Sequence, residues 1–278
     1  MPELPEVEAA RALIEARGLH REIAAVDDRD GYVCRPHAPG EIAAALVGRP
    51  LTAARRIGKS MWCETDGGEG PSLGLHLGMA GRIVIDDHYA GDPEGDQGAS
   101  GYAGHPDPAF SANPQWARFT IEFADGGTLL LFDKRRLGRA VLDPSLDALG
   151  PDALEVGRAE FVARVGQGAA PLKARIMDQG VIAGVGNLLA DETLWQAGLS
   201  PLRPAGDLDA DELAHLWRVL RASTRRAIKR GGVHTGDLIE HRRRGRVCPR
   251  CGTELVRATV GGRTTWWCPQ DQPGPAAR

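Results

Sequence analysis

The chain has 278 residues, of which 42% are hydrophobic and 26% charged, and its formal net charge is −3. This length and apolar content suffice for one large domain or two ordinary ones, which excludes disorder as the main state. A bilayer span is not expected, because no run of about 18 uncharged apolar residues occurs. The acidic start MPELPEVEAARAL lacks the basic segment and apolar stretch of a secretory signal, so we expect a cytoplasmic protein.

Charge is distributed unevenly along the chain. Residues 1–150 carry about −8, residues 151–200 about −2 and residues 201–278 about +7. Salt confines the influence of each charge to about 8 Å under physiological conditions, so the local excess decides which partner is attracted. The segments RASTRRAIKR and HRRRGR therefore indicate a polyanionic partner, unless they form only a solvated helix face and a basic loop.

Hydrophobic periodicity predicts the elements of the first half. A helix runs from Pro5 to about Arg17, with apolar residues at helical spacing. Short apolar runs separated by Gly and Asp turns follow from about 51 to 86 and from 117 to 142, as in an antiparallel sheet system. The stretch 86–115 is rich in Gly, Asp, Pro and Ser, and we expect a mobile surface loop without chemistry of its own.

A change in composition near Gly150 and Pro151 separates this strand-rich half from a helical half, with a linker near 143–155. The segments FVARV, LKARIMDQ, NLLADETLWQAGL and DADELAHLWRVLRASTRRAIKR all have helical spacing. The tail from Arg246 to Gln272 predicts two hairpins around cysteine pairs.

The tail carries a metal-ligand pattern. Cys248 and Cys251 are separated by two residues, and after 16 further residues Cys268 and Asp271 repeat that spacing. A zinc ribbon needs two turns that each present two ligands to one tetrahedral ion, and this pattern fits with a carboxylate as the fourth ligand. The alternative is that Cys248 and Cys251 are buried thiols in a hairpin that has lost its metal. One structural Zn²⁺ would stabilise a segment too small to bury a core.

The segment LKARIMDQGVIAGVGNLLADE predicts a helix that stops near Gly180 and a Gly-Val-Gly turn with Asn187 as N-cap of the next helix. Such a turn directs backbone N–H groups and a helix N-terminus at an anion, which suits a phosphate. The alternative is a tight corner in which glycine serves only the backbone angles.

The N-terminal segment MPELPEVE offers a nucleophile. With Met1 removed, Pro2 exposes a secondary amine, and an α-amino group titrates near pH 7.7–8.0, so an appreciable fraction is unprotonated at neutral pH. Attack of this amine on a sugar anomeric carbon would give an iminium, with Glu3 and Glu6 close in sequence as acid, base or charge stabiliser. Alternatively, Pro and Glu simply begin a helix, which both favour.

Together these motifs resemble the formamidopyrimidine-DNA glycosylase and endonuclease VIII family of bacterial base-excision repair enzymes. PELPEVE, HLGMAGR at 76–82, DKRRLG at 133–138, GVGNLLADE and the cysteine-rich tail occur in the family's order over nearly the whole chain. The resemblance implies an α+β fold. Its parts would be an N-terminal β-sandwich catalytic domain flanked by helices (1–142), the linker (143–155), a helical domain with a helix-two-turn-helix (156–240) and a zinc-finger-like β-hairpin with the tail (241–278).

The resemblance also implies a bifunctional DNA glycosylase and AP lyase that acts on damaged double-stranded DNA with one structural zinc. Pro2 matches the nucleophile that displaces the base at C1′ and forms the Schiff base for β,δ-elimination. Glu3 matches the catalytic acid at the deoxyribose ring oxygen, and Glu6 the neighbouring carboxylate. Lys59 matches a hairpin lysine that contacts the lesion's phosphate, although an exposed strand lysine would look the same in sequence.

The remaining matches concern DNA binding. Met79 and Arg135 match side chains that fill the hole left by a flipped nucleotide, although a buried strand methionine is an alternative for Met79. Leu137 takes the place of a common phenylalanine wedge, which keeps the apolar insertion but loses stacking on the base opposite the lesion. Two phosphate ligands, Asn187 and Arg263, and two further DNA contacts, His76 and Lys173, complete the set, and Arg263 is also implicated in δ-elimination.

The stretch Gly231–Arg246 is much shorter than in family members that excise oxidised guanine, where an added loop covers the flipped purine. We therefore expect oxidised pyrimidines, ring-opened purines or bare abasic sites as substrates. Two other hypotheses remain: a non-catalytic damaged-DNA or structured-DNA binding protein on the same scaffold, and a zinc-ribbon nucleic-acid module in another process. A single lesion has no two-fold axis, so we expect a monomer. Because the expected substrate is chromosomal DNA, we expect the protein to be associated with the bacterial nucleoid.

Overall fold

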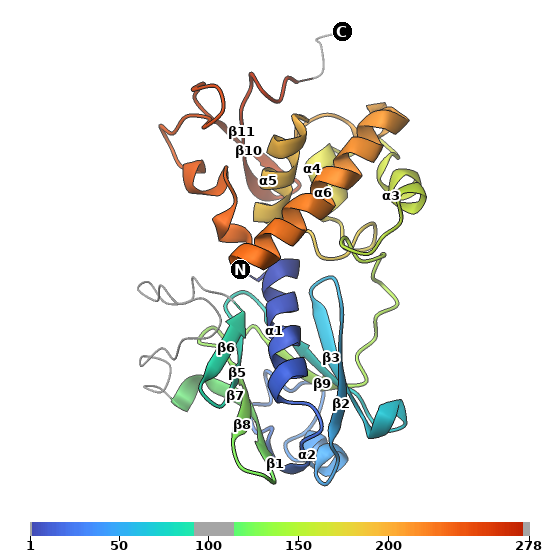
Figure 1. Ribbon diagram of the computed structural model, residues 1–278, viewed down its shortest axis with the longest axis vertical. Coiled ribbons are helices and arrows are strands. Elements are labelled where there is room, and N and C mark those ends of the chain that lie inside the picture. Colours follow the sequence, from blue (N-terminus) through green and yellow to red (C-terminus); the bar gives the residue numbers. More distant parts are fainter. Residues whose placement is uncertain (1, 92–113, 275–278) are drawn as a thin grey trace. The chain divides into compact units, whose positions relative to one another are not determined.

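Contacts within the chain divide it into two units, each with its own core. The computed structural model describes residues 2–91 and 114–274. The first unit comprises Met1–Pro2 and Glu6–Leu146, and the second comprises Glu3–Pro5 and Asp147–Arg278 (Figure 1). Within the described ranges, no helix combines the length and the apolarity needed to cross a membrane.

The first unit is built from two antiparallel sheets. The five-stranded sheet has the order β1-β7-β8-β5-β6 and consists of β1 (Ile23–Asp27), β7 (Ala117–Phe123), β8 (Thr128–Phe132), β5 (Arg82–Ile85) and β6 (His88–Gly91). The four-stranded sheet has the order β2-β3-β4-β9 and consists of β2 (Leu51–Ile57), β3 (Ser60–Thr65), β4 (Leu73–His76) and β9 (Arg139–Leu142). The described residues of this unit also form the helices α1 (Leu4–Arg17) and α2 (Glu41–Leu46) and the short 3₁₀ segments η1 (Asp66–Gly68) and η4 (Pro114–Trp116).

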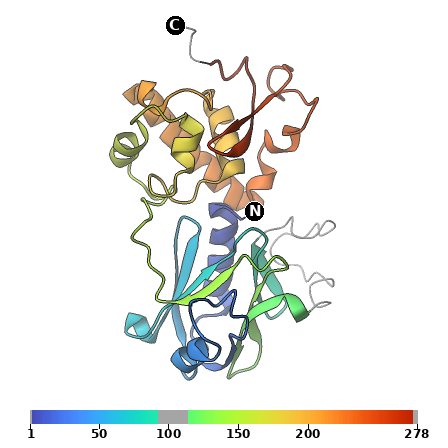
Figure 2. The ribbon, with the colours of Figure 1, turned by 180° about the vertical axis from the view of Figure 1, so that it is seen from behind.

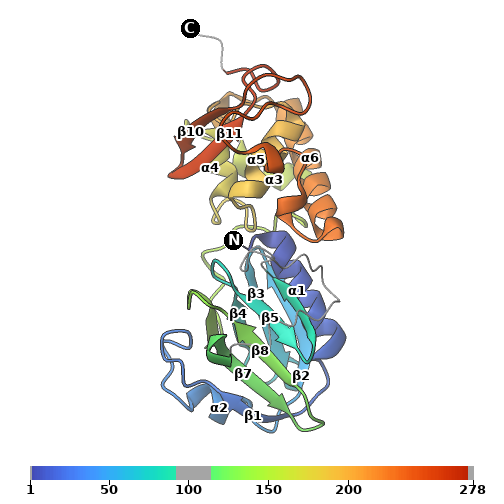
Figure 3. The ribbon, with the colours of Figure 1, turned by 90° about the vertical axis from the view of Figure 1, so that its left-hand side faces the viewer.

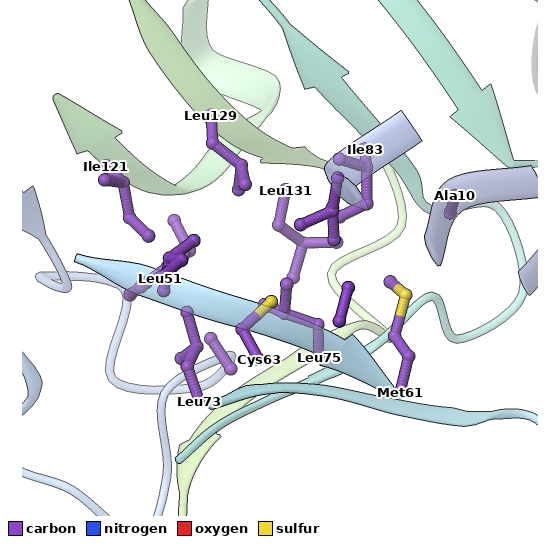
Figure 4. Packing of buried hydrophobic residues seen from close by; sticks show 14 of the residues in the cluster. Ala10, Leu51, Met61, Cys63, Leu73, Leu75, Ile83, Ile121, Leu129 and Leu131 are labelled. Carbon is purple, nitrogen blue, oxygen red and sulfur yellow. The ribbon is translucent and has the colours of Figure 1, made fainter. Parts of the chain in front are cut away.

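The apolar faces of the two sheets form the core of this unit. Figure 4 shows side chains of β2, β3 and β4 pointing toward those of β5, β7 and β8. Helix α1 contributes Val7, Ala10 and Ile14 to the same cluster, and it lies beside both sheets (Figure 3). The predicted N-terminal β-sandwich with flanking helices is therefore confirmed.

The predicted surface loop at 86–115 differs in part from the structure. Residues 88–91 form strand β6, which pairs with β5 at the edge of the sheet, and Tyr89 and Ala90 are buried. The central part of the stretch, 92–113, lies outside the described residues.

The second unit packs helices around a separate core (Figure 2). Its helices are α3 (Arg158–Val165), α4 (Leu172–Met177), α5 (Asn187–Ala197) and α6 (Ala210–Arg230), joined by the 3₁₀ segments η5 (Ala205–Asp207), η6 (Val233–Thr235) and η7 (Ile239–His241). A capping box starts α6, because Asp209 accepts the Glu212 N–H and the Glu212 carboxylate accepts the Asp209 N–H. Gly231 then ends α6 in the left-handed conformation, with φ of 92°.

Residues 150–155 were expected to lie in the linker 143–155, but together with Val156 they pack into the second unit. Ala153 and Val156 are buried in its apolar cluster, and the Ala153 N–H donates to Ala183 O at 2.9 Å. The change from one unit to the other falls between Leu146 and Asp147.

The tail contains one hairpin ladder, where two hairpins were expected. Strands β10 (Val256–Val260) and β11 (Arg263–Trp267) pair through a turn at Gly261 and Gly262, and β11 packs against α5. The first cysteine pair lies in a tight loop closed by the single bridge Val247–Glu254. The predicted helical domain with a zinc-ribbon-like hairpin is confirmed in this form.

Candidate functional site

The carboxylate of Glu3 lies at the N-terminus of helix α5. It is fully buried, and its two oxygens accept the N–H groups of Leu188 at 2.8 Å and Leu189 at 3.1 Å. N–H groups in the first turn of a helix lack helical partners and carry partial positive charge, so they stabilise an ionised carboxylate. The next residue, Leu4, donates its N–H to Gly184 O at 3.2 Å and so fixes the segment against this turn.

The helix N-terminus thus binds the protein's own carboxylate, where the sequence predicted a phosphate. The N-cap is Gly186, and Asn187 is the first helical residue instead of the cap. A Cβ on Gly186 would overlap the Glu3 carboxylate, so this glycine is required for close approach. Gly184 is required for a different reason, because its φ of 110° is strained for other residues.

The candidate nucleophile and its second acidic neighbour belong to the first unit. Pro2 is buried and precedes α1, which begins at Leu4, so Pro2 does not serve as a helix-starting proline. Glu6 lies in the first turn of α1 and is 3% exposed. Because Glu3 follows Pro2 directly in the chain, a buried carboxylate accompanies the residue that would carry the amine.

Three candidate DNA-binding residues lie in or directly beside turns of the four-stranded sheet. Lys59 and Gly58 form the two-residue turn between β2 and β3. Met79 lies in the turn after β4 with 38% of its surface exposed, which removes the alternative of a buried strand methionine. His76, the last residue of β4, accepts the Gly78 N–H on Nδ1 at 3.0 Å, so its neutral ring keeps the donor on Nε2. Burial, assisted by the Lys59 charge, lowers the pKa of His76 below its ordinary value.

The loop between β8 and β9 holds the proposed wedge residues. The buried carboxylate of Asp133 accepts the N–H groups of Arg135 at 2.9 Å, Leu137 at 2.7 Å and Gly138 at 2.7 Å. Between them, Arg136 adopts a φ of 56°. These contacts fix a tight loop in which Arg135 is exposed and Leu137 is half-buried.

Lys173 is enclosed by protein oxygens. Its ammonium donates to Asn187 Oδ1 at 2.7 Å, Thr265 Oγ1 at 2.8 Å and Thr264 O at 3.2 Å, and it lies 2.7 Å from Asp191 Oδ1. An ammonium has three N–H donors, and this one is fully buried, so none is left for a phosphate. The expectation that Lys173 contacts DNA directly does not fit this arrangement, and Lys173 instead orients Asn187.

Asp191 joins Lys173 to the basic tail segment. Its Oδ2 accepts Arg242 Nε at 2.8 Å and the Trp266 N–H at 3.2 Å. Burial lowers the pKa of Lys173 and raises that of Asp191, and the ion pair opposes both shifts. Asp191 is absent from the residues predicted from sequence, although its position four residues after Asn187 places both on one helix face.

The basic segment HRRRGR divides into one half-buried, paired arginine and three exposed arginines. Arg242 is committed to the Asp191 carboxylate. The other members remain exposed: Arg243, Arg244 and Arg246. Arg263, the first residue of β11, is also exposed and is followed directly by the two threonines that hold Lys173. Asn187 and Arg263 are therefore brought together through the Lys173 ammonium.

The four metal-ligand candidates form one cluster. The ligand atoms of Cys248, Cys251, Cys268 and Asp271 all lie within 4.8 Å of one another, with 3.4 Å between the Cys251 and Cys268 sulfurs. Tetrahedral Zn²⁺ with bonds of about 2.0–2.3 Å places its ligand atoms about 3.3–3.8 Å apart, so the residues fit the ion. Burial raises the pKa of the Cys268 thiol to about 12, and a bound zinc ion would displace that proton. The donor set is thus compatible with one structural zinc site.

Three family models match consecutive parts of the chain. The formamidopyrimidine-DNA glycosylase N-terminal domain matches residues 1–140, and the H2TH domain of the same enzymes matches residues 149–237. A zinc finger found in FPG and IleRS matches residues 245–274, which contain the four-ligand cluster.

Whole-length relatives agree with these matches. A formamidopyrimidine-DNA glycosylase of a Nocardioides species is 33% identical, and the match covers 100% of this chain and 96% of the relative. The formamidopyrimidine-DNA glycosylase of Chloroflexus aggregans is also 33% identical, and the match covers 97% of this chain and 98% of the relative. The crystal structure of the MutM (Fpg) protein from Thermus thermophilus is 30% identical with a TM-score of 0.74, covering 99% of this chain and 100% of that chain. The fold also matches Lactococcus lactis Fpg in complex with abasic DNA, at 24% identity, 98% and 99% coverage and a TM-score of 0.76.

Proposed function

The chain belongs to the formamidopyrimidine-DNA glycosylase family, and we propose that it excises damaged bases through an imine formed by Pro2. As a member of this family, it is a DNA glycosylase and AP lyase of base-excision repair with a structural zinc site. The observation that carries the residue assignment is the buried Glu3 carboxylate, which follows Pro2 and is stabilised by two N–H groups of α5.

The chemistry assigned to Pro2 and Glu3 is a proton transfer coupled to nucleophilic attack. The Glu3 carboxylate accepts one proton from the Pro2 ammonium, and the freed nitrogen lone pair attacks C1′ while the C1′–base bond breaks and its electron pair leaves with the base. The remaining N–H proton, made acidic by the new N–C1′ bond, neutralises the departing base anion. Glu3 then gives its proton to the ring oxygen as the nitrogen lone pair opens the C1′–O bond, which leaves an iminium between Pro2 and the sugar. The iminium acidifies the neighbouring C2′–H, and elimination of the 3′ and then the 5′ phosphate follows.

DNA binding is assigned to exposed and half-buried side chains in both units. Lys59 and His76 in the first unit, and Asn187 and Arg263 in the second, would contact phosphates. Met79, Arg135 and Leu137 would fill the space left by the flipped nucleotide, which partly offsets an unstacking cost of a few kcal/mol. Because phosphate contacts release counterions, affinity should fall steeply with salt.

The segment Gly231–Arg246 bears on the choice of substrate. Its Leu238 is buried and donates its N–H to Glu192 Oε2 at 2.9 Å, and its Asp237 forms ion pairs with Arg226 and Arg230. The segment is thus short and held by protein contacts, which argues against a long loop that closes over a flipped purine. Ring-opened purines, after which the relatives are named, oxidised pyrimidines and abasic sites are the proposed substrates.

Borohydride trapping on abasic-site duplex tests the assignment. We expect a covalent adduct whose peptide map places the DNA on Pro2, and mass spectrometry should show that Met1 is absent. A variant with one alanine inserted before Pro2 replaces the imino terminus with a primary amine displaced by one residue, and it should lose most trapping. A non-catalytic damaged-DNA binding protein would instead bind the duplex without any adduct. A panel of single-lesion duplexes then ranks the substrates.

We further propose that the protein acts as a monomer on chromosomal DNA in the cytoplasm. A single lesion presents no two-fold axis, and the proposed contacts all come from one chain. Sedimentation of the protein with one lesion duplex should give a one-to-one complex.

A further inference from the structure

We propose that Tyr32, Arg35 and Arg139 form a surface, here called the arginine platform, that binds the phosphate backbone of the DNA strand opposite the damaged base. The platform belongs wholly to the first unit and contains none of the residues assigned above. The proposal rests on the proposed function, because it takes the loop with Arg135 and Leu137 as the part that enters the duplex.

The platform is an exposed aromatic ring surrounded by guanidinium groups. Tyr32 is 47% exposed, and the guanidinium carbons of Arg35 and Arg139 lie 4.0 and 5.1 Å from the centre of its ring. Arg136 is a third neighbour at 5.7 Å. The ring face attracts and orients cations, and aromatic and cationic side chains presented together are typical of surfaces that bind nucleic acid.

The carboxylates near the platform are already engaged elsewhere. Asp30 binds Arg136 through both oxygens, at 2.6 and 3.0 Å, and Asp27 binds Arg29 at 2.6 and 2.8 Å. Asp28 is buried and accepts three N–H groups at the start of α2.

The two platform arginines thus keep unneutralised charge. In the described part of the chain, the hydrogen bonds of Arg35 and Arg139 go to carbonyl oxygens, those of Tyr32 and Gly138, both at 2.7 Å. Two guanidinium charges are therefore held beside one ring without a carboxylate, and an external anion would relieve their repulsion.

The position of the platform identifies the strand. Asp30 lies in the loop after β1 that carries Tyr32, and it pairs with Arg136 of the β8–β9 loop, which holds the wedge residues. The Ala140 N–H also donates to Val33 O at 3.2 Å, so the two loops contact each other directly. Leu137, the residue of the wedge loop that faces the base opposite the lesion in this proposal, lies two residues before Arg139. With Leu137 inserted toward the undamaged base, the backbone nearest the platform would be that of the undamaged strand.

The test compares binding to duplex and to single-stranded DNA. For R35A/R139A we expect weaker binding to a duplex with an abasic-site analogue, and a slope of log K against log salt that is smaller by about 2, because each lost phosphate contact lowers the slope by about 1. Y32A should lower duplex affinity and change the slope by much less than 1. Binding of all variants to the single strand that carries the same analogue should match the wild type.

Matched variants separate charge from structure. R35K/R139K retains both charges and should keep the wild-type salt slope. R29A removes an arginine that is exposed but paired with Asp27, and it should leave the slope unchanged. If R35A/R139A binds duplex with the wild-type affinity and slope, or if affinity for the single strand falls equally, the assignment to the undamaged strand is overturned. Borohydride trapping on single-stranded abasic DNA by the wild type reports on Pro2 independently of this result.

Discussion

The two units hold their proposed functional groups by different means. In the first unit the core is apolar and joins two sheets, and Lys59, Met79 and Arg135 lie in turns between strands. In the second unit, Asn187 is held by a buried ammonium, which in turn is paired with the buried Asp191. A sandwich with a large core can fix its turns through backbone geometry, whereas a short hairpin beside a few helices needs ionic contacts and a metal to fix its side chains.

The two units should therefore respond differently to the loss of a buried side chain. Breaking a buried ion pair is strongly unfavourable because it leaves one charge without compensation. Removing apolar volume instead leaves a cavity whose cost depends on how far the surroundings relax.

Zinc removal should separate the two units most clearly. A strong chelator should unfold residues 246–272, because structural zinc in small fingers contributes about 10 kcal/mol or more to folding. Amide hydrogen exchange in β10 and β11 should become fast, while β2, β3 and β4 keep their protection. D271C supplies a fourth thiolate and should slow zinc loss to the chelator, whereas D271A should speed it. Equal loss of protection in both units would contradict the comparison.

Glu3→Gln tests the carboxylate that precedes helix α1 and belongs to the second unit. The amide cannot accept the Pro2 proton as a carboxylate does, and its NH₂ group opposes the N–H groups of Leu188 and Leu189. We expect single-turnover base excision to slow about 10²- to 10⁴-fold, with affinity for abasic DNA changed much less. Glu15→Gln, at an exposed position of the same helix, is the control. An E3Q protein with the wild-type rate would remove Glu3 from the mechanism.

Lys173→Met tests the buried charges of the second unit. It leaves Asp191 Oδ1 and Asn187 Oδ1 without their ammonium donor, while Asp191 keeps Arg242, so we expect a loss of about 1–3 kcal/mol for each unsatisfied oxygen in the stability of that unit. K173M/D191N should lose more, because it also leaves the Arg242 guanidinium without its carboxylate. The first-unit counterpart, L131A, should cost about 2–5 kcal/mol and act on the sandwich alone. Denaturant unfolding followed by hydrogen exchange assigns each loss to its unit.

His76 predicts a small pH dependence in the first unit. Burial and Lys59 lower its pKa in the free protein, so its ring is neutral at pH 7. A bound phosphate would raise that pKa, so affinity for DNA should increase as the pH falls from the bound-state pKa toward the lower free-state pKa. The increase is at most about tenfold for each pH unit that separates the two pKa values. Fluorescence anisotropy between pH 5 and 8 measures this, and H76Q should flatten the profile. If the H76Q variant keeps the wild-type pH dependence of DNA affinity, groups other than His76 cause that dependence.

Most of the secondary structure was predictable from local patterns. Helix α1 was expected at Pro5–Arg17 and is observed at Leu4–Arg17, and its apolar spacing matches the cluster that it enters. Strand β6 was missed, because HYAG is a short edge strand inside a Gly- and Asp-rich stretch and has too few residues to show a period. The cysteine spacing likewise predicted the four-residue cluster that is compatible with a structural zinc site, since four residues in two turns form a local pattern.

Local patterns in the chain were enough to propose the chemical groups: an amine at Pro2, acids at Glu3 and Glu6, a metal-ligand set and a basic final third. The contacts that these groups make came from the fold. It placed Glu3 at the N-terminus of α5, 185 residues away, and it enclosed Lys173 among oxygens of α5 and β11. Segments that are distant in the chain bury these groups and supply their hydrogen-bond partners. Which carboxylate binds a helix N-terminus, and which oxygens accept hydrogen bonds from an ammonium, therefore depends on packing that a local sequence pattern does not contain.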